Sequence, residues 1–570
     1  MAGRTDGGNR DRGAAVRAAV SGVIAAAVGM AAAELLAGLL NGAPSLVIGA
    51  GTLVIALQPP GAKDFMASLF GTNDKLVLNV AVVLIALVVA AGVGVVGRRN
   101  FALAAVTFVA FAAVGVVGAM QSGLISLPLA LLSGAVAAAS GLLTLRVLLA
   151  SAQSASSPAG EPASAAPDPA GPMAGPVPPE TADLSREVVG VPGGAASEPQ
   201  RVADLPEGVE PMPDWARRRF LIQAGAFLGA AAVAGLVGRN LVERQHPAGP
   251  PAAAGSLPAV RDPAPPLAPD QSLSAPGVTP IVTPNDQFFR IDTALTIPQV
   301  DVATWQLKVD GMVEHPLTFS YAELLAMPLI EQYVTIACVS NSVGGALVGN
   351  TLWTGVRLKE ILAKAGVKSG ATQIVGRSVD GFTVGFPTEW ALDPSREPMV
   401  ALGMNRLPLP ADHGYPARLI VPGLFGYVSA TKWLSQIELT TDAFNGYWIP
   451  LGWAKDGPIL TQSRIDNLGA LIRGVAAGPV DLSGVAWAPD RGIERVEVKI
   501  DDGPWQQAML SRAISKAAWV QWMLRWQATP GRHVIEVRAT DGTGVVQTDQ
   551  QTGSAPDGAR GHQRIEVTVN

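Results

Sequence analysis

The chain has 570 residues and a formal net charge of −5, and 49% of its residues are hydrophobic against only 15% charged. A soluble globular chain carries about 25% charged residues, so we predict that part of this chain lies in a lipid bilayer. The mild charge gives no footprint for nucleic acid, and we expect no nucleic-acid partner. The single cysteine, Cys338, excludes an internal disulfide, a four-cysteine zinc site and a chain-borne iron–sulfur cluster, and no CxxCH haem motif occurs.

Residues 1–150 are predicted to form a membrane domain with about four transmembrane helices. Each span is long enough for the roughly 20 apolar residues that cross a bilayer. The four predicted spans are residues 20–40, 76–97, 101–120 and 124–149. The apolar run 46–57 is too short to cross, and we interpret it as re-entrant or interfacial. The spans contain none of the five histidines, so they cannot hold a haem between two histidines, and we expect no haem.

Basic residues predict the orientation of this region. With a cytoplasmic N-terminus and four crossings, Arg98, Arg99 and the Arg146 end of the fourth span lie inside, as the positive-inside rule requires. A fifth crossing would place Arg98 and Arg99 outside. Glu34 is the only carboxylate in a span, and it either serves a function or snorkels from a helix end.

Two linkers flank a further helix. Residues 151–214 are rich in Pro, Ala, Gly and Ser, and we expect a disordered cytoplasmic linker. Residues 243–277 form a second linker. The helix at 215–242 follows the sequence RRRFL, which resembles a twin-arginine targeting signal through Arg217 and Arg218; the alternative is an ordinary span with basic residues inside. Both interpretations place the rest of the chain outside the cytoplasm.

Two globular regions follow. Residues 278–470 are predicted to form an α+β domain, with a strand at 305–313, a short helix at 320–326 and an amphipathic helix at 356–366. In residues 471–570, short alternating strands predict an all-β sandwich of immunoglobulin type.

Cys338 follows the apolar run VTIA and precedes SNSVGG, so a strand is predicted to carry the thiol into a turn. A lone cysteine is often a small buried hydrophobic residue. The polar, glycine-rich surroundings favour a site wall instead, where a thiolate can bind a soft metal. One cysteine cannot hold a metal alone, so a cofactor would have to supply further ligands.

Several motifs in order resemble the sulfite oxidase family of molybdenum enzymes, in a bacterial membrane-anchored form. They are TPNDQFF at 283–289, the cysteine strand with NTLWTGVRLKEIL, and HGYPARLIVPGLFGYVSATKWL at 413–434, followed by the terminal sandwich. The resemblance covers residues 278–570. It implies a sulfite-oxidase-type domain with a dimerisation-type sandwich, in which one molybdopterin dithiolene and the Cys338 thiolate hold the metal and catalyse oxygen-atom transfer.

The resemblance also implies a set of cofactor-binding residues besides Cys338. These are Asn285, Phe288, Phe289, Ser378, Asp380, His413, Arg418, Ser429, Thr431 and Lys432. A guanidinium grips phosphate with two hydrogen bonds, which suits Arg418 to the pterin phosphate; the alternative is a surface ion pair. Ser378 and Asp380 could equally form an ordinary turn.

The sequence departs from the family after the cysteine. VSNSVGG replaces the region that carries an anion-binding arginine pair in sulfite oxidases, with Val343 and Gly344 in that place, and Arg290 lies one position from another such arginine. Trp453 stands near the position of a metal-proximal tyrosine. These changes predict a less charged substrate, such as a sulfoxide or an N-oxide. Three alternatives are sulfite oxidation, an inactive membrane-tethered binding protein, and a hydrolase using Cys338 with His413.

We therefore expect a multi-pass cell-membrane protein whose catalytic domain is extracytoplasmic. Electrons must pass to or from a partner, because we expect no haem or iron–sulfur cluster in the chain. The expected partners are the membrane, a small-molecule substrate, an unidentified electron-transfer protein or quinone, and a second copy through the C-terminal domain.

Overall fold

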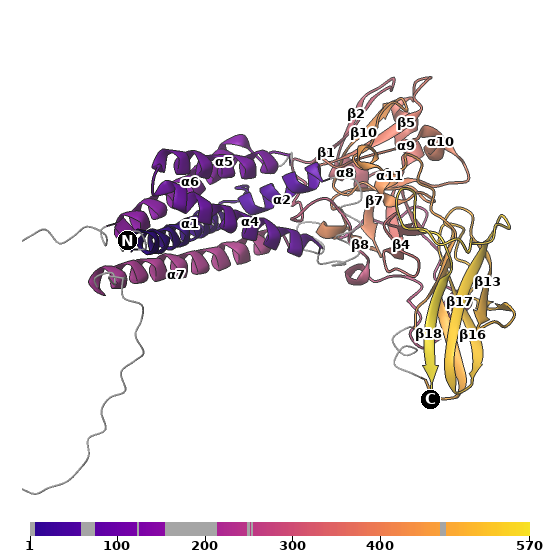
Figure 1. The fold of residues 1–570 in the computed structure, drawn as a ribbon. Helices are drawn as coiled ribbons and strands as arrows, with labels where there is room; N and C mark the ends of the chain where they lie inside the picture. The colour runs from indigo at the N-terminus through magenta and orange to yellow at the C-terminus, as the bar shows by residue number, and fades with distance from the viewer. Residues whose placement is uncertain are drawn as a thin grey trace, which may run out of the picture.

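The structure, a computed structural model, describes residues 6–58, 74–121, 125–153, 214–247, 251, 255–467 and 475–570. A helical bundle, a mixed α/β domain and a C-terminal β region follow one another along the chain (Figure 1). The predicted linker at 151–214 lies outside the described residues except at its two ends, which belong to helices.

Within the described residues, the bundle contains α1 (Asp6–Leu39), α2 (Leu46–Leu57), α4 (Asp74–Gly97), α5 (Phe101–Ala119), α6 (Leu127–Gln153) and α7 (Asp214–Gln245). Five of them are long and apolar enough to cross a membrane, judged by length and composition alone; α2 is the short one. The predicted helices are therefore present at the expected places.

Glycines let the helices of the bundle approach closely. A Cβ added to Gly22 of α1 would lie 2.0 Å from the Ala90 carbonyl oxygen of α4, and one added to Gly94 would lie 2.0 Å from that of Ala18. A Cβ at Gly118 of α5 would lie 1.8 Å from the carbonyl oxygen of Gly49 in α2. Small residues at such crossings are typical of helices that pack within membranes.

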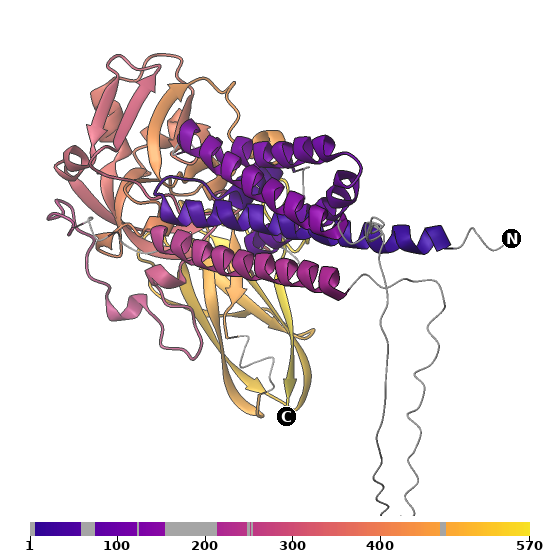
Figure 2. The same cartoon turned by 90° about the vertical axis from the view of Figure 1, so that its left-hand side faces the viewer.

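One end of the bundle faces the α/β domain (Figures 1 and 2). Lys75, at the start of α4, forms an ion pair with Asp292 of that domain, and Gln245, at the end of α7, donates to the Gly38 carbonyl of α1. Because α4 runs antiparallel to α1, its far end carries Arg98 and Arg99 to the opposite end of the bundle. The short helix α2 lies between α1 and α4 in the chain, at the end facing the domain.

Two sheets form the core of the α/β domain. One has the order β2-β1-β10-β5-β6, with β1 and β10 parallel, and the other has the order β3-β4-β7-β8, with β9 paired to β7. The strands are β1 (Gln306–Gly311), β2 (Leu317–Ser320), β3 (Leu329–Ala337), β4 (Val348–Arg357), β5 (Gln373–Ser378), β6 (Thr383–Pro387), β7 (Met399–Met404), β8 (Leu407–Pro408), β9 (Arg418–Ile420) and β10 (Leu434–Thr440).

Short helices cover these sheets. The α-helices are α8 (Tyr321–Leu325), α9 (Leu358–Ala365), α10 (Thr388–Leu392) and α11 (Gly426–Ser429), and the 3-10 helices are η3 (Pro269–Gln271), η4 (Asn285–Gln287), η5 (Ala411–His413) and η6 (Ile449–Leu451). A reciprocal capping box between Ser320 and Glu323 begins α8. Gly366, at φ +69°, ends α9 where predicted.

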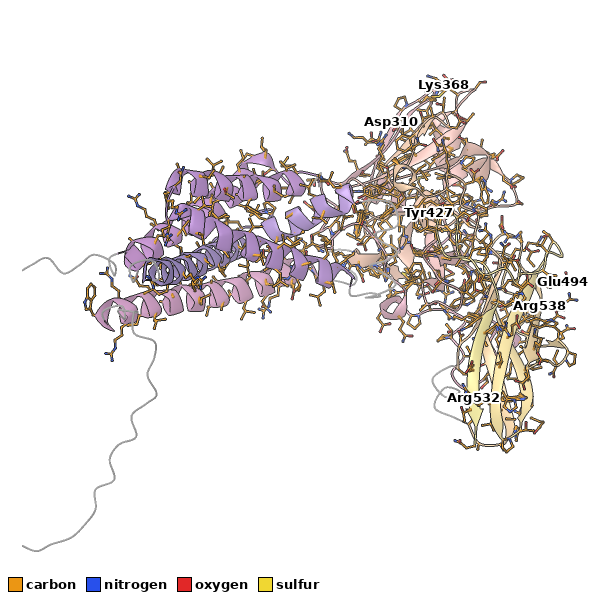
Figure 3. All side chains as sticks on the ribbon, viewed as in Figure 1. Asp310, Lys368, Tyr427, Glu494, Arg532 and Arg538 are labelled. Atoms are coloured by element: carbon orange, nitrogen blue, oxygen red, sulfur yellow. The ribbon has the colours of Figure 1, made fainter. Side chains whose placement is uncertain are left out.

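The C-terminal region consists of two antiparallel sheets, β11-β12-β16-β15 and β14-β13-β17-β18, which share an apolar core. The strands are β11 (Gln462–Ile465), β12 (Gly478–Trp487), β13 (Ile493–Ile500), β14 (Gln506–Gln507), β15 (Met509–Leu510), β16 (Val520–Ala528), β17 (Gly531–Asp541) and β18 (Gln563–Val569). Because β11 pairs with β12, the sandwich begins before the predicted boundary at residue 471. Figure 3 shows Glu494, Arg532 and Arg538 on this region, and Tyr427 near the centre of the α/β domain.

The β region and the α/β domain are joined by polar contacts. Arg464 of β11 donates to the Gly345 carbonyl at 3.0 Å and to Thr279 Oγ1 at 2.9 Å. The described part of the predicted linker 243–277 is also docked: the Arg261 amide donates to the Leu329 carbonyl of β3 at 3.0 Å.

Candidate active site

Cys338 directly follows β3 and is held by the turn that leads to β4. Its amide donates to the Leu347 carbonyl at 2.9 Å, and its carbonyl accepts from the Asn341 amide at 3.0 Å. The Asn341 side chain in turn accepts from the Leu347 amide at 2.8 Å. The residue is 9% exposed and its surroundings form a cavity, so the thiol sits on a rigid support at a cavity wall.

The cavity lining contains two chemically different groups of residues, which we call the aromatic wall and the charged wall. The aromatic wall consists of Phe289, Phe382, Tyr427, Trp448 and Trp453. The charged wall consists of Asp292, Asp380, Arg418 and Lys432. Cys338, Val339 and Ser340 line the same space.

Asp292 is the centre of the charged wall. Its carboxylate contacts Lys75 Nζ at 2.5 Å, Lys432 Nζ at 2.9 Å and Arg290 Nε at 3.1 Å. Burial alone would raise the pKa of Asp292, but the three cations hold that pKa well below its ordinary value. Asp292 is therefore ionised, and it anchors the bundle and the cavity wall at one point.

Arg418 carries a positive charge with little compensation. The residue is 5% exposed, its Nη1 donates to the His413 carbonyl at 3.3 Å, and its guanidinium carbon lies 5.2 Å from the Trp353 ring centroid. Its Nε has no hydrogen-bond partner among the described residues. Burial lowers the pKa of Arg418 to about 10. A buried donor without a partner is costly, so this one marks a place for an anionic ligand.

Lys432 is a second buried cation in this wall. Burial and the nearby charge of Arg418 together lower the pKa of Lys432 to about 8, against the opposing effect of Asp292. Burial raises the pKa of Asp380, although hydrogen bonds from Ser378 and Phe382 oppose that shift. The buried wall thus fits the phosphate of a pterin cofactor, to which a guanidinium and an ammonium can both donate.

His413 lies behind the charged wall. Its Nε2 lies 3.0 Å from the Asn285 carbonyl, and its ring packs edge-on against Phe288 at 5.6 Å between centroids. Burial and the charge of Lys432 lower the pKa of His413 to about 4, so the ring is neutral and donates through Nε2. Nδ1 is then a buried acceptor that has no partner in the described chain.

The structure brings six of the predicted cofactor-binding residues to one cavity: Phe289, Cys338, Ser378, Asp380, Arg418 and Lys432. The other five form a layer outside the lining: Asn285, Phe288, His413, Ser429 and Thr431. Asn285 accepts from Asn405 at 2.8 Å, and Ser429 Oγ donates to the Phe425 carbonyl at 3.0 Å. Their contact with a cofactor stays a prediction.

The loop after Cys338 differs from its predicted role as a site wall. Only Val339 and Ser340 of this loop line the cavity, whereas Asn341 closes the turn. Gly344, at φ +74°, lies against the Gln563 side chain of the C-terminal region, where a Cβ would come within 2.5 Å of the amide nitrogen. Arg290 forms an ion pair with Asp292 at 3.1 Å and is not among the lining residues, so a role in binding an anion stays a prediction.

Sequence reasoning missed Asp292, Phe382, Tyr427 and Trp448, which all line the cavity. Tyr427 lies within the stretch 413–434 that carries the family resemblance, so its position in that motif could have indicated a place in the site. Asp292 has no local signal, since its partners are distant in the chain. The described residues contain no group of three or more His, Cys, Asp or Glu that could hold a metal ion, so metal binding here requires ligands from a cofactor.

Comparisons with known proteins agree with this site. The family profile described as "Oxidoreductase molybdopterin binding domain" matches residues 294–448. Mitochondrial sulfite oxidases of Mus musculus and Homo sapiens are 28% identical over 318 and 315 residues, which are 47% of this chain and 57% of each relative. The chain thus spans little more than half the length of these curated relatives.

The "Uncharacterized oxidoreductase YuiH" of Bacillus subtilis is 34% identical over 157 residues, which are 28% of this chain and 76% of that protein. The crystal structure of the sulfane dehydrogenase SoxCD from Paracoccus pantotrophus is 24% identical, covering 53% of this chain and 83% of that chain, with a TM-score of 0.44.

A mixed α/β domain with a cavity that holds one thiol and two buried cations defines, together with the profile match, a molybdopterin-binding oxidoreductase domain. The chain belongs to the sulfite oxidase family of molybdenum-dependent oxidoreductases.

Proposed function

We propose that this protein is a membrane-anchored molybdopterin oxidoreductase that transfers an oxygen atom at an extracytoplasmic site. One observation carries the proposal: the Cys338 thiol and the buried, partly unpaired Arg418 guanidinium line the same cavity. A thiol supplies the protein ligand to a soft metal, and the guanidinium supplies the complementary charge for the anionic part of a pterin.

The chain's own residues would hold and orient the cofactor, which supplies the two-electron redox chemistry when bound. Cys338 would provide a thiolate to the metal from its rigid turn. Arg418 and Lys432 would donate to the phosphate. Asp292 keeps Lys432 in place, with Nζ at 2.9 Å from its carboxylate, so that the lysine is oriented before the cofactor arrives.

The aromatic wall supports a neutral substrate. Tyr427, Trp448 and Trp453 line the cavity beside Cys338, and the Tyr427 hydroxyl already donates to the Ala454 carbonyl at 2.7 Å. An apolar lining stabilises an uncharged oxo compound such as a sulfoxide or an N-oxide better than an oxyanion. Sulfite is the second candidate, because Arg418 and Lys432 belong to the same lining.

The bundle supports membrane anchoring. Five helices have the length and apolar composition of membrane spans, and Arg98 and Arg99 follow α4 at the end away from the catalytic domain. By the positive-inside rule the catalytic domain would lie outside the cytoplasm. Export through a twin-arginine signal at Arg217 and Arg218, an immunoglobulin-like topology of the sandwich and dimerisation through it belong to the same proposal.

A dye-coupled screen tests the reaction. Full-length protein from a host that makes molybdopterin is assayed with reduced viologen and methionine sulfoxide or an N-oxide, and with ferricyanide and sulfite. We expect oxidation of viologen by the neutral oxo compounds and none in the Cys338→Ser variant. Turnover of sulfite alone would favour the second candidate, and absence of molybdenum from the pure protein would contradict the proposal.

A further inference from the structure

A second cavity lies between the helical bundle and the catalytic domain. Its volume is about 500 Å³, and it is bordered on the bundle side by the ends of α1, α5 and α7 and by α2. On the other side it is bordered by residues 293–299, by residues 380–382 and by Tyr447. We call it the interface cavity. Figure 1 shows α2 at the end of the bundle that faces the catalytic domain.

The interface cavity adjoins the active-site cavity. Thr293, Asp380 and Phe382 line both of them, so the two spaces are separated by no more than these side chains. The Thr293 hydroxyl lies 3.5 Å from the Asp380 carboxylate, at the limit of a hydrogen bond. A molecule in the interface cavity would therefore be next to the wall of the active site.

Aromatic rings connect the two cavities. Phe382 and Tyr447 have ring centroids 5.8 Å apart, and Tyr447 and Trp448 have centroids 5.1 Å apart. Tyr447 lines the interface cavity and Trp448 lines the active-site cavity. The two cavities are thus connected by a row of packed aromatic rings. Electrons could move along these rings from one cavity to the other.

The interface cavity also contains groups that exchange protons. His246, at the end of α7, has Nδ1 2.7 Å from the Val242 carbonyl, which fixes the ring and leaves Nε2 as the acceptor nitrogen. Ser45, at the start of α2, donates to the buried Glu34 carboxylate at 2.6 Å. Asp380 lies opposite, and its burial raises its pKa. Polar groups therefore surround the space on both sides.

The helix α2 lies between the interface cavity and a separate apolar cavity. Ser45, Ile48 and Thr52 on one face line the interface cavity. Leu46, Leu53 and other residues on its opposite face line a separate, almost wholly apolar cavity of about 400 Å³ among the bundle helices. A short helix between an apolar space and a polar one suits a ligand with an apolar tail and a polar head.

We propose that the interface cavity binds a membrane quinone, which exchanges electrons with the active site along the ring path. This inference rests on the proposed function. In the reductive direction, a hydroquinone and an oxo substrate give a quinone, the deoxygenated product and water. The hydroquinone hydroxyls release two electrons and two protons, and the substrate oxygen leaves with those protons as water.

A quinone suits the site better than a redox protein. The space lies between two parts of one chain, at the end of helices that are apolar enough to cross a membrane. The sequence has one cysteine and no CxxCH motif, so it offers no chain-borne cluster or c-type haem to receive electrons from a protein partner.

Photoaffinity labelling tests the binding without any need for the cofactor. Full-length protein in detergent is irradiated with an azido-quinone, and labelled peptides are identified by mass spectrometry. We expect labelling of α2, the end of α7 and residues 293–299, with competition by excess unmodified quinone. Thr52→Trp, which fills the cavity, should reduce this labelling at least tenfold. Val88→Trp is the control, because Val88 is 73% exposed on α4 and outside the cavity lining.

If excess phospholipid prevents the labelling and excess quinone does not, the cavity binds a lipid, and the inference is overturned. Equal labelling in Thr52→Trp and the parent would do so as well.

A reduction assay then tests electron transfer. Protein of known molybdenum content is mixed with a short-chain hydroquinone or with dithionite, and the absorbance of the metal centre is followed. We expect both reagents to reduce the parent and Val88→Trp, and only dithionite to reduce Thr52→Trp at the parent rate. Reduction of the parent by dithionite but not by hydroquinone would overturn the quinone inference and leave the proposed function intact, whereas protein without molybdenum would defeat the proposed function itself.

Discussion

The two walls of the active-site cavity differ in whether their buried polar groups are already paired. The charged wall buries Asp292, Arg418 and Lys432 together, and its stability depends on each cation having an anion nearby. The aromatic wall buries apolar rings, and the Tyr427 hydroxyl among them already donates to the Ala454 carbonyl. The charged wall is therefore incomplete without an anionic ligand, and the aromatic wall is complete in itself. From this difference we propose that the charged wall binds the cofactor and that the aromatic wall shapes the substrate space.

The largest expected effect is at the thiol between the walls. Cys338→Ser should lower turnover more than about 100-fold, the upper range for loss of even an outer-shell partner of a metal ligand. The fold should persist, because the backbone contacts of Cys338 with Leu347 and Asn341 do not involve the thiol. Turnover with the best substrate and far-UV circular dichroism check this prediction; unchanged turnover would remove the thiol from the reaction.

Asp292→Asn tests the charged wall itself. Removing the carboxylate leaves Lys432 buried without its counter-ion, and breaking a buried pair costs about 3–5 kcal/mol. Urea unfolding measures the loss. The control is Asp270→Asn, which breaks the exposed Asp270–Arg512 pair and should lower stability far less than Asp292→Asn does. Equal losses in the two variants would show that the wall is not a charge cluster.

The same carboxylate predicts a dependence of stability on pH. The folded-state pKa of Asp292 lies below its unfolded value. The contribution of the Asp292 carboxylate to the free energy of unfolding is therefore fully present above the unfolded-state pKa of about 3.9. It is lost as the pH falls toward the folded-state pKa. The stability difference between the parent and Asp292→Asn should thus shrink between about pH 5 and pH 2, as measured by urea unfolding across that range.

Arg418→Gln should lower cofactor retention. The variant keeps a shorter polar side chain but loses the charge and the paired donors, and we expect about 10–100-fold weaker cofactor binding, as for other supporting partners of metal sites. Molybdenum per protein after dialysis is the measurement. Arg377→Gln is the control, because Arg377 forms a partly exposed pair with Glu438. Full molybdenum content in Arg418→Gln would contradict the phosphate assignment.

The smallest effect is expected on the aromatic wall. Tyr427→Phe removes one hydrogen bond of 2.7 Å and leaves the Ala454 carbonyl to find another partner, which should cost about 1 kcal/mol of stability. Molybdenum content should not change, because Tyr427 belongs to the wall without charge. Thermal unfolding tests the change in stability, and elemental analysis tests the molybdenum content. Loss of the metal in this variant would contradict the claim that only the charged wall binds the cofactor.

Local patterns predicted much of this molecule. The apolar β-branched run before Cys338 indicated β3, the alternation at 305–313 indicated β1, and Gly366 ended α9 as expected. Apolar length alone indicated the helices of the bundle, because crossing a membrane requires a long uninterrupted run. The family motifs predicted that Cys338, Arg418 and Lys432 belong to one cofactor site, and the three residues do line one cavity.

Contacts between distant segments could not be predicted. Asp292 gains its role from Lys75, 217 residues before it, and from Lys432, 140 residues after it. Tyr427 and Trp448 look like core aromatics in the sequence, since nothing local tells a cavity wall from a packed interior. Strand β11 has only four residues, and its pairing with β12 depends on the other sheet. The SNSVGG loop was assigned to the cavity, whereas Gly344 packs against Gln563 near the far end of the chain.

The central claim is that Cys338 binds the metal. X-ray absorption at the molybdenum edge, on full-length protein and on Cys338→Ser with equal molybdenum content, tests it most directly. We predict one sulfur fewer in the coordination shell of the variant than in that of the parent. An identical sulfur shell in both proteins would contradict the account.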